Sequence, residues 1–258
     1  MNSLPRNEFK QALIARKTQI GLWCNFATLP TVEVLAHAGF DWLLLDMEHT
    51  PNDLQILGTQ LLALRGTPTA AVVRVPSADM AFIKRALDTG SPNLMVPNIQ
   101  SAAQAREVVA WTRFAPEGLR GTAGSTRGGG YTRYKDYMAR ANDELGLVLQ
   151  IESREGLDAL SDICLVPGVD AVFIGPSDLS ASLGHRGQPG HPEVQAAISN
   201  AISVANAEGK AIGILTVDGK AEPYLDQGAT MVGVGSDMHL LIAAADALAA
   251  RFAGRRQT

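Results

Sequence analysis

The sequence has few cysteines, few aromatic residues and no excess of positive charge. Its 258 residues include 2 cysteines, Cys24 and Cys164, far apart and without CxxC spacing, which argues against a disulfide scaffold and a zinc site built on cysteines. The net charge of −4 provides no basic surface for nucleic acid or an anionic membrane. No apolar run is long enough to span a bilayer, and the N-terminus lacks the apolar core of a signal peptide. We therefore expect a cytoplasmic protein with no nucleic-acid or membrane partner.

The sequence does contain a regular alternation of short apolar runs with longer amphipathic segments. The apolar runs have no polar face, which is typical of strands buried in a parallel sheet. The segments between them have helical periodicity, and Gly39 and Gly209 stand where helices would end. The predicted strands cover residues 20–25, 42–46, 70–74, 93–96, 147–151, 171–174, 211–215 and 231–235, and the predicted helices cover residues 31–37, 53–64, 80–87, 102–112, 154–160, 192–208, 220–225 and 238–252.

Eight strands that alternate with eight helices predict an α/β fold, a (β/α)8 or TIM barrel, in a single domain over residues 1–258. An open doubly wound sheet has the same alternation, so the count favours the barrel without excluding the sheet. No change of composition divides the chain, and barrels of about 250 residues are commonly one domain. The amphipathic segment 6–16 is predicted to close the bottom of the barrel.

Two segments are open to more than one interpretation. The irregular insertion 115–142 is rich in glycine and reads mostly as a flexible loop; the alternative is a substrate lid that carries Arg120 or Arg127 to an anionic group. The alanine-rich helix 238–252 fits either a helix that packs on its own core or one that packs on another subunit, since small residues allow close packing in both cases.

Polar side chains gather where the predicted strands end. In a (β/α)8 barrel the carboxyl ends of the strands meet at one mouth, where the chemistry of such enzymes takes place. Polar residues at these ends favour an active site at the mouth; they are Asp46, Glu48, His49, Arg74, Gln150, Glu152, Ser177, Asp178, Thr216, Ser236 and Asp237.

Glu152 and Asp178 follow two consecutive strands, so both carboxylates are expected at the mouth. Two carboxylates, completed by water and substrate oxygens, form the oxygen-rich site that Mg²⁺ or Mn²⁺ prefers. Taken singly, Asp178 also fits a helix N-cap and Glu152 also fits a helix-dipole contact. As a pair on adjacent strands, they favour a metal site.

His49 lies in a turn before Pro51, and Asp46 is placed three residues earlier, where it is expected to hold one ring nitrogen. The other nitrogen is then free to act as a base near neutral pH; a structural histidine is the alternative. Arg74 is expected either to pair with a neighbouring carboxylate or to neutralise an oxyanion or a substrate carboxylate. No lysine stands at a strand end, which argues against a Schiff-base mechanism.

Several motifs, in order along residues 21–235, resemble the HpcH/HpaI aldolase family. They are Gly21-Leu22-Trp23, Asp46-Met47-Glu48-His49-Thr50-Pro51-Asn52, Arg74-Val75-Pro76, Leu87-Asp88, Gly118-Leu119-Arg120-Gly121, Gln150-Ile151-Glu152 and Gly175-Pro176-Ser177-Asp178-Leu179-Ser180.

The resemblance implies a class II, metal-dependent pyruvate aldolase on a (β/α)8 barrel, without an organic cofactor. It implies that Glu152 and Asp178 bind a divalent metal (Mg²⁺ or Mn²⁺, with Co²⁺ as a further candidate). His49, supported by Asp46, matches the acid–base residue, and Arg74 matches the cation that stabilises the enolate. A homotrimer or homohexamer with helix 238–252 exchanged between subunits is also implied.

The resemblance further implies five substrate contacts besides Arg74. Gln150 and the backbone of Gly175 and Ser177 would meet the substrate, the latter two at the pyruvate carboxylate. Leu215 would cover the methyl side, and Asp88 matches an acidic position that reaches a neighbouring subunit's site. The segments 90–93 and 128–130 depart from a common family pattern, which leaves the acceptor aldehyde open.

The expected reaction is reversible cleavage of a 4-hydroxy-2-oxo acid to pyruvate, or hydroxypyruvate, and an aldehyde. Decarboxylation of oxaloacetate or another 2-oxo diacid on the same scaffold is the first alternative. A non-catalytic barrel is the second, and the full set of polar residues at the mouth argues against it.

Overall fold

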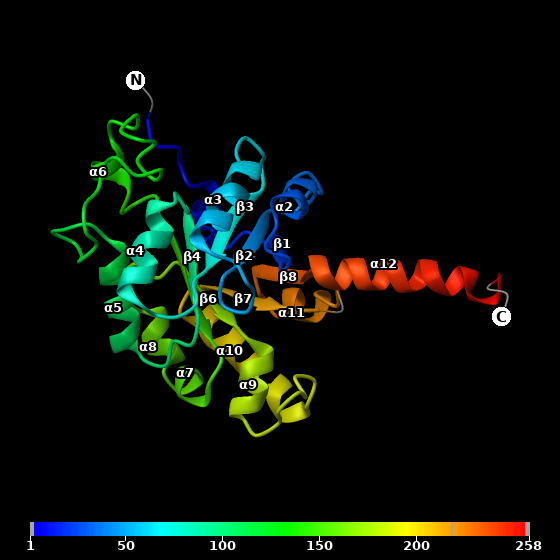
Figure 1. Ribbon diagram of the computed structural model, residues 1–258. Coiled ribbons are helices and arrows are strands. Elements are labelled where there is room, and N and C mark those ends of the chain that lie inside the picture. Colours follow the sequence, from blue (N-terminus) through cyan, green and yellow to red (C-terminus); the bar gives the residue numbers. More distant parts are fainter. Residues whose placement is uncertain (1–2, 218, 256–258) are drawn as a thin grey trace.

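Eight parallel strands close into a barrel in the order of the sequence, with β8 pairing back onto β1 (Figure 1). The structure is a computed structural model that describes residues 3–217 and 219–255. It confirms the predicted (β/α)8 barrel, and every predicted strand is correct to within one residue at each end. The strands are β1 (Gln19–Cys24), β2 (Trp42–Asp46), β3 (Ala70–Arg74), β4 (Asn93–Val96), β5 (Gly146–Ile151), β6 (Ala171–Ile174), β7 (Ala211–Leu215) and β8 (Met231–Ser236).

Helices connect the strands around the outside of the barrel (Figure 1). Several begin at a side chain that accepts the backbone N–H groups of the first turn, as Asp53, Asp79 and Ser101 do. They are α1 (Glu8–Ile14), α2 (Leu29–Leu35), α3 (Leu54–Ala63), α4 (Met80–Asp88), α5 (Ala102–Thr112), α6 (Tyr137–Arg140), α7 (Arg154–Asp158), α8 (Leu160–Cys164), α9 (Pro176–Ser182), α10 (Pro192–Ala207), α11 (Glu222–Asp226), α12 (Asp237–Phe252) and the 3-10 turn η1 (Ala253–Arg255).

The interior of the barrel contains a cluster of aromatic side chains. The rings of Trp23 and Phe173 lie 5.4 Å apart, and Trp23 meets Trp42 edge-on at 5.9 Å. A Cβ atom at position 21 would collide with the ring of Trp42, so glycine is required there. Phe9 and Leu13 of α1 are buried in the same cluster, which confirms that the N-terminal helix closes the barrel.

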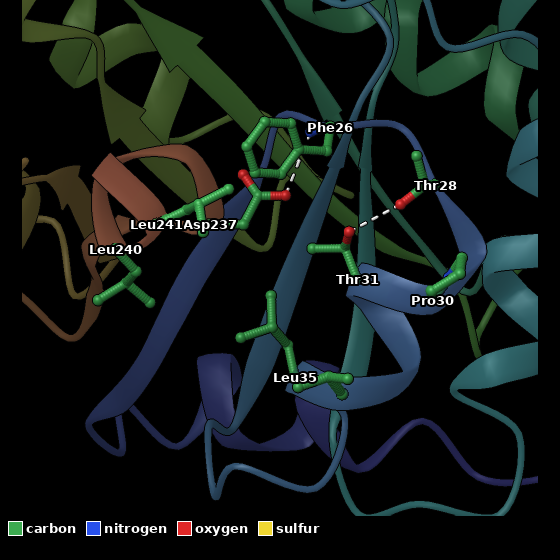
Figure 2. Close-up of a pocket in the computed structure, with 9 residues that line it drawn as sticks. Phe26, Thr28, Pro30, Thr31, Leu35, Asp237, Leu240 and Leu241 are labelled. Atoms are coloured by element: carbon green, nitrogen blue, oxygen red, sulfur yellow. Dashed lines mark hydrogen bonds between the residues drawn. The ribbon is translucent and has the colours of Figure 1, made fainter. Parts of the chain in front are cut away.

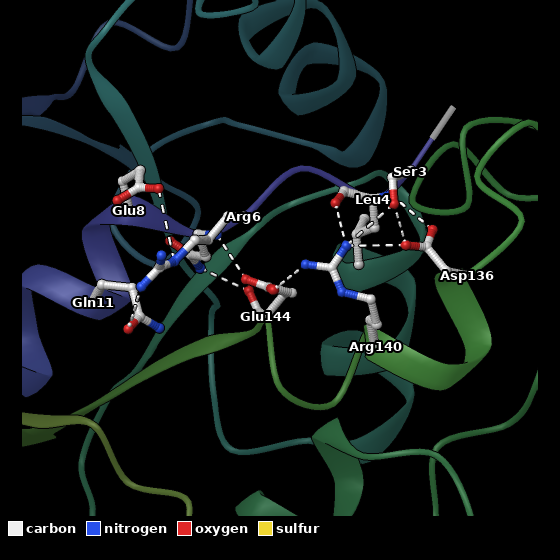
Figure 3. Close-up of polar contacts among 9 residues, drawn as sticks. Ser3, Leu4, Arg6, Glu8, Gln11, Asp136, Arg140 and Glu144 are labelled. Carbon is white, nitrogen blue, oxygen red and sulfur yellow. Dashed lines mark hydrogen bonds and ion pairs between the residues drawn. The ribbon is translucent and has the colours of Figure 1, made fainter. Parts of the chain in front are cut away.

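The insertion 115–142 follows α5 and precedes β5. In a (β/α)8 barrel such a helix-to-strand connection lies at the amino ends of the strands, opposite the mouth. Figure 3 shows how its helix α6 is tied to the N-terminal segment. Arg140 donates to the carbonyl of Leu4 at 2.7 Å and to Glu144 at 2.5 Å, and Glu144 accepts the N–H of Asn7 at 2.7 Å. The insertion is therefore an anchored segment.

Arg120 is buried within this insertion and does not reach the pocket at the mouth. Its guanidinium bonds Asp88 at 2.9 Å and the hydroxyl of Tyr137 at 3.0 Å, and it stacks 4.3 Å from the ring centroid of Phe114. Arg127 donates to the carbonyl of Thr89 at 2.7 Å. The lid interpretation is therefore wrong for the chain's own barrel, because both cations serve to hold the insertion in place.

Helix α12 projects away from the barrel (Figure 1), and only its first residue, Asp237, is buried. The interpretation that it packs on its own core is therefore wrong. Its exposed side chains include Leu240, Leu241, Ile242 and Leu248, each at least half exposed. Over the residues that the structure describes, no helix is both long enough and apolar enough to cross a membrane.

Candidate active site

A hollow of about 330 Å³ opens where the strands end at the mouth of the barrel. Seven residues of the predicted site line it: His49, Arg74, Gln150, Gly175, Ser177, Asp178 and Leu215. Trp23 and Phe173, from the interior cluster, contribute apolar wall. The pocket therefore combines titratable side chains from several strands with an apolar wall.

A larger hollow of about 640 Å³ lies between α2 and α12 (Figure 2). Its walls are mainly apolar, and Asp237 is the one titratable side chain among its lining residues. That carboxylate already accepts the N–H groups of Asn25 at 2.8 Å and Phe26 at 3.2 Å. Size alone would favour this hollow, but the polar groups that a reaction requires line the smaller one.

Arg74 ends β3 and is held by two carboxylates. Its Nε lies 2.9 Å from Oδ1 of Asp46 and its Nη2 lies 2.7 Å from Oδ2, a two-pronged contact. Its Nη1 lies 2.9 Å from Glu48. Burial acts to lower the pKa of Arg74, but the hydrogen bonds and charge of Asp46, followed by the charge of Glu48, raise it above its usual value. Arg74 is therefore a fixed, permanent positive charge on the pocket wall.

The structure corrects the expected pairing of Asp46 with His49. Asp46 is fully buried, and its two oxygens accept from Arg74 and from the N–H of Glu48. The carboxylate beside His49 is Glu48, whose Oε2 lies 3.6 Å from the ring Nε2. The pairing predicted from a three-residue spacing is wrong because the strand register places Asp46 directly opposite Arg74.

Glu48 is the residue of this site whose role the sequence does not reveal. It bridges Arg74 and His49, and burial is the largest of the effects that raise its pKa. Its position two residues after Asp46, at the same strand end, is the feature of the sequence that could have identified it.

The buried carboxylate Glu152 lies within a concentration of negative charge. Gln150 donates a hydrogen bond to Glu152. Burial first, and then the negative charges of Glu48 and Asp178, raise the pKa of Glu152 to about 7. Carboxylates that repel one another across a small space supply the hard oxygen donors that a divalent cation prefers, so these residues fit the expected metal.

Gly175 and Ser177 contribute differently from one another. The N–H of Gly175 donates to the carbonyl of Ile151 at 3.1 Å. It is therefore not free to bind the substrate carboxylate, contrary to the prediction. A Cβ at this position would collide with Glu152 and Gln150, which means that glycine provides space beside the carboxylate. Ser177 lies in the first turn of α9, where helical N–H groups have no partner within the helix.

Asp88 ends α4, and α4 leads back to the amino end of the barrel. Its carboxylate pairs with Arg120 at 2.9 Å, away from the pocket formed by this chain. The structure therefore does not bring Asp88 together with the other predicted site residues within one chain.

Comparison with known families agrees with this geometry. The model of the family described as HpcH/HpaI aldolase/citrate lyase matches residues 19–244. The chain belongs to this family.

Relatives within the HpcH/HpaI family align over almost their whole length. The chain is 48% identical over 252 residues to the 5-keto-4-deoxy-D-glucarate aldolase of Klebsiella pneumoniae subsp. pneumoniae, covering 97% of this chain and 98% of the relative. It is 48% identical over 253 residues to the 4-hydroxy-2-oxo-heptane-1,7-dioate aldolase of Salmonella dublin, covering 97% and 96%. A solved structure of an HpcH/HpaI aldolase/citrate lyase family protein from Burkholderia cenocepacia J2315 matches with a TM-score of 0.92 and 38% identity, covering 95% and 98%.

These findings confirm the predicted family and the predicted barrel. They also confirm the predicted class of activity, because the relatives are named aldolases: the chain is an enzyme of the carbon–carbon lyase type.

Proposed function

We propose that this protein is a divalent-metal-dependent aldolase that reversibly cleaves 4-hydroxy-2-oxo acids to pyruvate, or hydroxypyruvate, and an aldehyde. The names of the two relatives support this class of substrate. Both describe an oxo acid with a hydroxyl group two carbons from the oxo group, which is the unit that a retro-aldol reaction cleaves. The observation that carries the proposal is that Asp178 and Arg74 line one pocket and that both lie close enough to the buried Glu152 for their charges to shift its pKa.

Glu152 and Asp178 are the residues that would hold the cation, with Gln150 orienting Glu152 through its hydrogen bond. When bound, a divalent cation supplies Lewis-acid polarisation of the substrate's 2-oxo group. The all-oxygen donor pair suits Mg²⁺ or Mn²⁺, and Co²⁺ is also compatible.

Arg74 would stabilise the negative charge that develops on the 2-oxo oxygen as the C3–C4 bond breaks. Its contact with Asp46 fixes the guanidinium before the substrate arrives, so little reorganisation is needed during the reaction. Donors prearranged in this way in a water-poor site are typically worth about 3 kcal/mol of transition-state stabilisation.

His49 would take the proton of the C4 hydroxyl group. Its side chain is 60% exposed at the pocket rim, within reach of the aldehyde end of a substrate. The charge that it gains is offset by Glu48, 3.6 Å away. At the opposite end, the N–H of Ser177 would meet the substrate carboxylate, and Leu215 would pack against the methyl side.

Product analysis tests the reaction class. Incubation with a 4-hydroxy-2-oxo acid is expected to yield equal amounts of pyruvate and aldehyde. Incubation with oxaloacetate that releases CO2 faster than the first reaction proceeds would instead establish the decarboxylase. A panel of aldehydes offered with pyruvate and with hydroxypyruvate would then define the acceptor.

We also propose that the enzyme assembles as a homotrimer or homohexamer in which α12 packs on a neighbouring copy. The support is the exposed apolar surface along α12, which continues into the hollow beside α2 (Figure 2). Contiguous apolar surface of this kind is typical of a surface that another chain covers. In such an assembly Asp88, which does not line the pocket of its own chain, would reach the pocket of a neighbouring copy.

We place the enzyme in the cytoplasm. The free, buried thiols of Cys24 and Cys164 fit a reducing compartment.

A further inference from the structure

We propose a second metal site, selective for Zn²⁺, in the connection between α9 and α10. Its ligands are His185, His191 and Glu193. One ring nitrogen from each histidine and one carboxylate oxygen of Glu193 lie within 4.8 Å of one another. This cluster shares no residue with the pocket at the mouth, so the proposal does not depend on the aldolase mechanism.

The local sequence folds the connection so that these three residues meet. The N–H of His185 donates to the carbonyl of Ser180 at 2.7 Å as α9 ends. Gly184 and Gly187 have φ of +91° and +75°, the left-handed conformation that glycine adopts without strain, and they turn the chain back. His191 then caps α10, its Nδ1 accepting the N–H of Glu193 at 3.3 Å.

In the structure the three side chains already contact one another. The rings of His185 and His191 are stacked, with 3.6 Å between centroids and 15° between planes. Nε2 of His185 lies 2.8 Å from Oε2 of Glu193. The second oxygen of Glu193 lies 4.0 Å from Arg154. The hydrogen bond between His185 and Glu193 therefore occupies the place that a metal ion would take.

The donor set favours zinc over the metals expected at the mouth. Two imidazoles and one glutamate form a ligand set that Zn²⁺ uses in proteins, with water in the fourth position, whereas Mg²⁺ prefers oxygen alone. Tetrahedral coordination at the usual Zn–N lengths requires donor atoms roughly 3.3 Å apart, so the cluster must contract. The rings must also turn out of their stack, because lone pairs that lie in two nearly parallel planes, with 3.6 Å between the ring centroids, cannot both point at one ion. Glu193 is 56% exposed and His185 is 23% exposed, and none of the three ligands belongs to the buried core, so the rotation does not require the core to repack.

Zinc bound here would fix the segment that carries Asp178. Asp178 lies in the first turn of α9, and His185 follows the end of the same helix. A ligand that binds the folded state stabilises it by mass action. Zn²⁺ is therefore expected to raise the melting temperature even when Mg²⁺ saturates the site at the mouth.

The test compares Zn²⁺ stoichiometry, melting temperature and the visible spectrum of bound Co²⁺, all in excess Mg²⁺. The variant combines His185→Gln, which retains a hydrogen-bond donor toward Glu193, with His191→Asn, which retains a strong helix cap. The control is His37→Asn, since His37 is an exposed histidine outside the cluster. We expect the double variant to bind one equivalent of Zn²⁺ less than the wild type and to show no rise in melting temperature on addition of Zn²⁺. It is also expected to lose the visible absorption bands of Co²⁺ bound in a low-symmetry site. The control is expected to behave as the wild type in all three measurements.

An unchanged Zn²⁺ stoichiometry in the double variant would overturn the proposal, as would wild-type protein that binds no zinc beyond the site at the mouth. A Glu152→Gln, Asp178→Asn variant separates the two metal proposals, because it is expected to lose aldolase activity and still bind one Zn²⁺ at the α9–α10 connection. Removal of a nearby positive charge by Arg154→Ala is expected to tighten Zn²⁺ binding; weaker binding would count against Glu193 as a ligand.

Discussion

Arg74 and Asp46 are paired through two parallel hydrogen bonds of 2.9 and 2.7 Å, between the ends of neighbouring strands. Both side chains are buried. The pair therefore gives the barrel mouth a cation whose position is set by the β2–β3 register rather than by a flexible loop. Contacts of this kind are strong and directional, because the guanidinium matches the planar geometry of the carboxylate.

Replacement of Arg74 by lysine is expected to lower kcat by about two to three orders of magnitude, because a lysine keeps the charge and loses the two-pronged geometry. Arg74→Ala is expected to lower kcat similarly and to reduce stability as well, by about 3–5 kcal/mol, since it leaves Asp46 buried without a partner. Steady-state kinetics and urea unfolding measure the two effects. Arg85→Lys, an exposed arginine on α4, is the control. Normal turnover by the lysine variant would remove Arg74 from the chemistry.

Because Glu48 lies beside His49 and Asp46 is paired with Arg74, substitutions are expected to be energetically coupled within each of these two pairs. We expect the effects of Glu48→Gln and His49→Ala on kcat/KM to be strongly non-additive, because the two groups lie 3.6 Å apart, and residues in contact couple whereas separate ones do not. Asp46→Asn is expected to couple with Arg74→Lys instead. Double-mutant cycles measure the coupling energy of each pair. Stronger coupling of His49 to Asp46 than to Glu48 would reinstate the pairing expected from the sequence.

The sequence predicts the barrel well because its strands are apolar on both faces and short, a local pattern. It predicts most residues of the pocket for a related reason, since the carboxyl ends of barrel strands must converge. It does not predict the partner of Asp46, because that depends on the register between β2 and β3.

The same limit applies to short helices. The four-residue α6 has too few residues to show a period, and its position depends on contacts such as Leu4 with Asp136, 132 residues apart. The seven-residue α9 is not predicted because only Leu179 and Ser180 of its residues are buried, which is too few to mark an apolar helix face. The direction of α12 is equally invisible in its composition, because small and apolar residues suit a core and an interface alike.

Gly175→Ala is expected to weaken metal binding and to reduce activity at least tenfold, since the added Cβ would collide with Glu152 and Gln150. The matched control is Gly58→Ala in the interior of α3, where a Cβ meets no atom within 4 Å. That change is expected to leave activity intact and to stabilise the fold by about 0.5–1 kcal/mol. Calorimetric Mn²⁺ titration and urea unfolding provide the readouts. Unaltered Mn²⁺ affinity in Gly175→Ala would show that the space beside Glu152 is not needed.

Charged residues on α12 are expected to disrupt the assembly. Leu240→Glu combined with Leu248→Glu places two charges on the exposed apolar surface of the helix, and burial of an unpaired charge at an interface is strongly unfavourable. Native mass spectrometry is expected to show trimers or hexamers for the wild type and smaller species for the variant. Leu62→Glu, an equally exposed leucine on α3, controls for the effect of surface charge. Wild-type protein that is monomeric at micromolar concentration would contradict the exchange of α12.

The catalytic role of Glu152 and Asp178 is tested by the dependence of cleavage on a divalent metal. Protein stripped with a chelator is assayed for release of pyruvate from a 4-hydroxy-2-oxo acid, before and after addition of Mg²⁺ or Mn²⁺, alongside Glu152→Gln and Asp178→Asn. Stripped wild-type protein is expected to be inactive, and either metal is expected to restore its activity but not that of the two variants. Full activity in excess chelator, or variants as active as the wild type, would contradict this role.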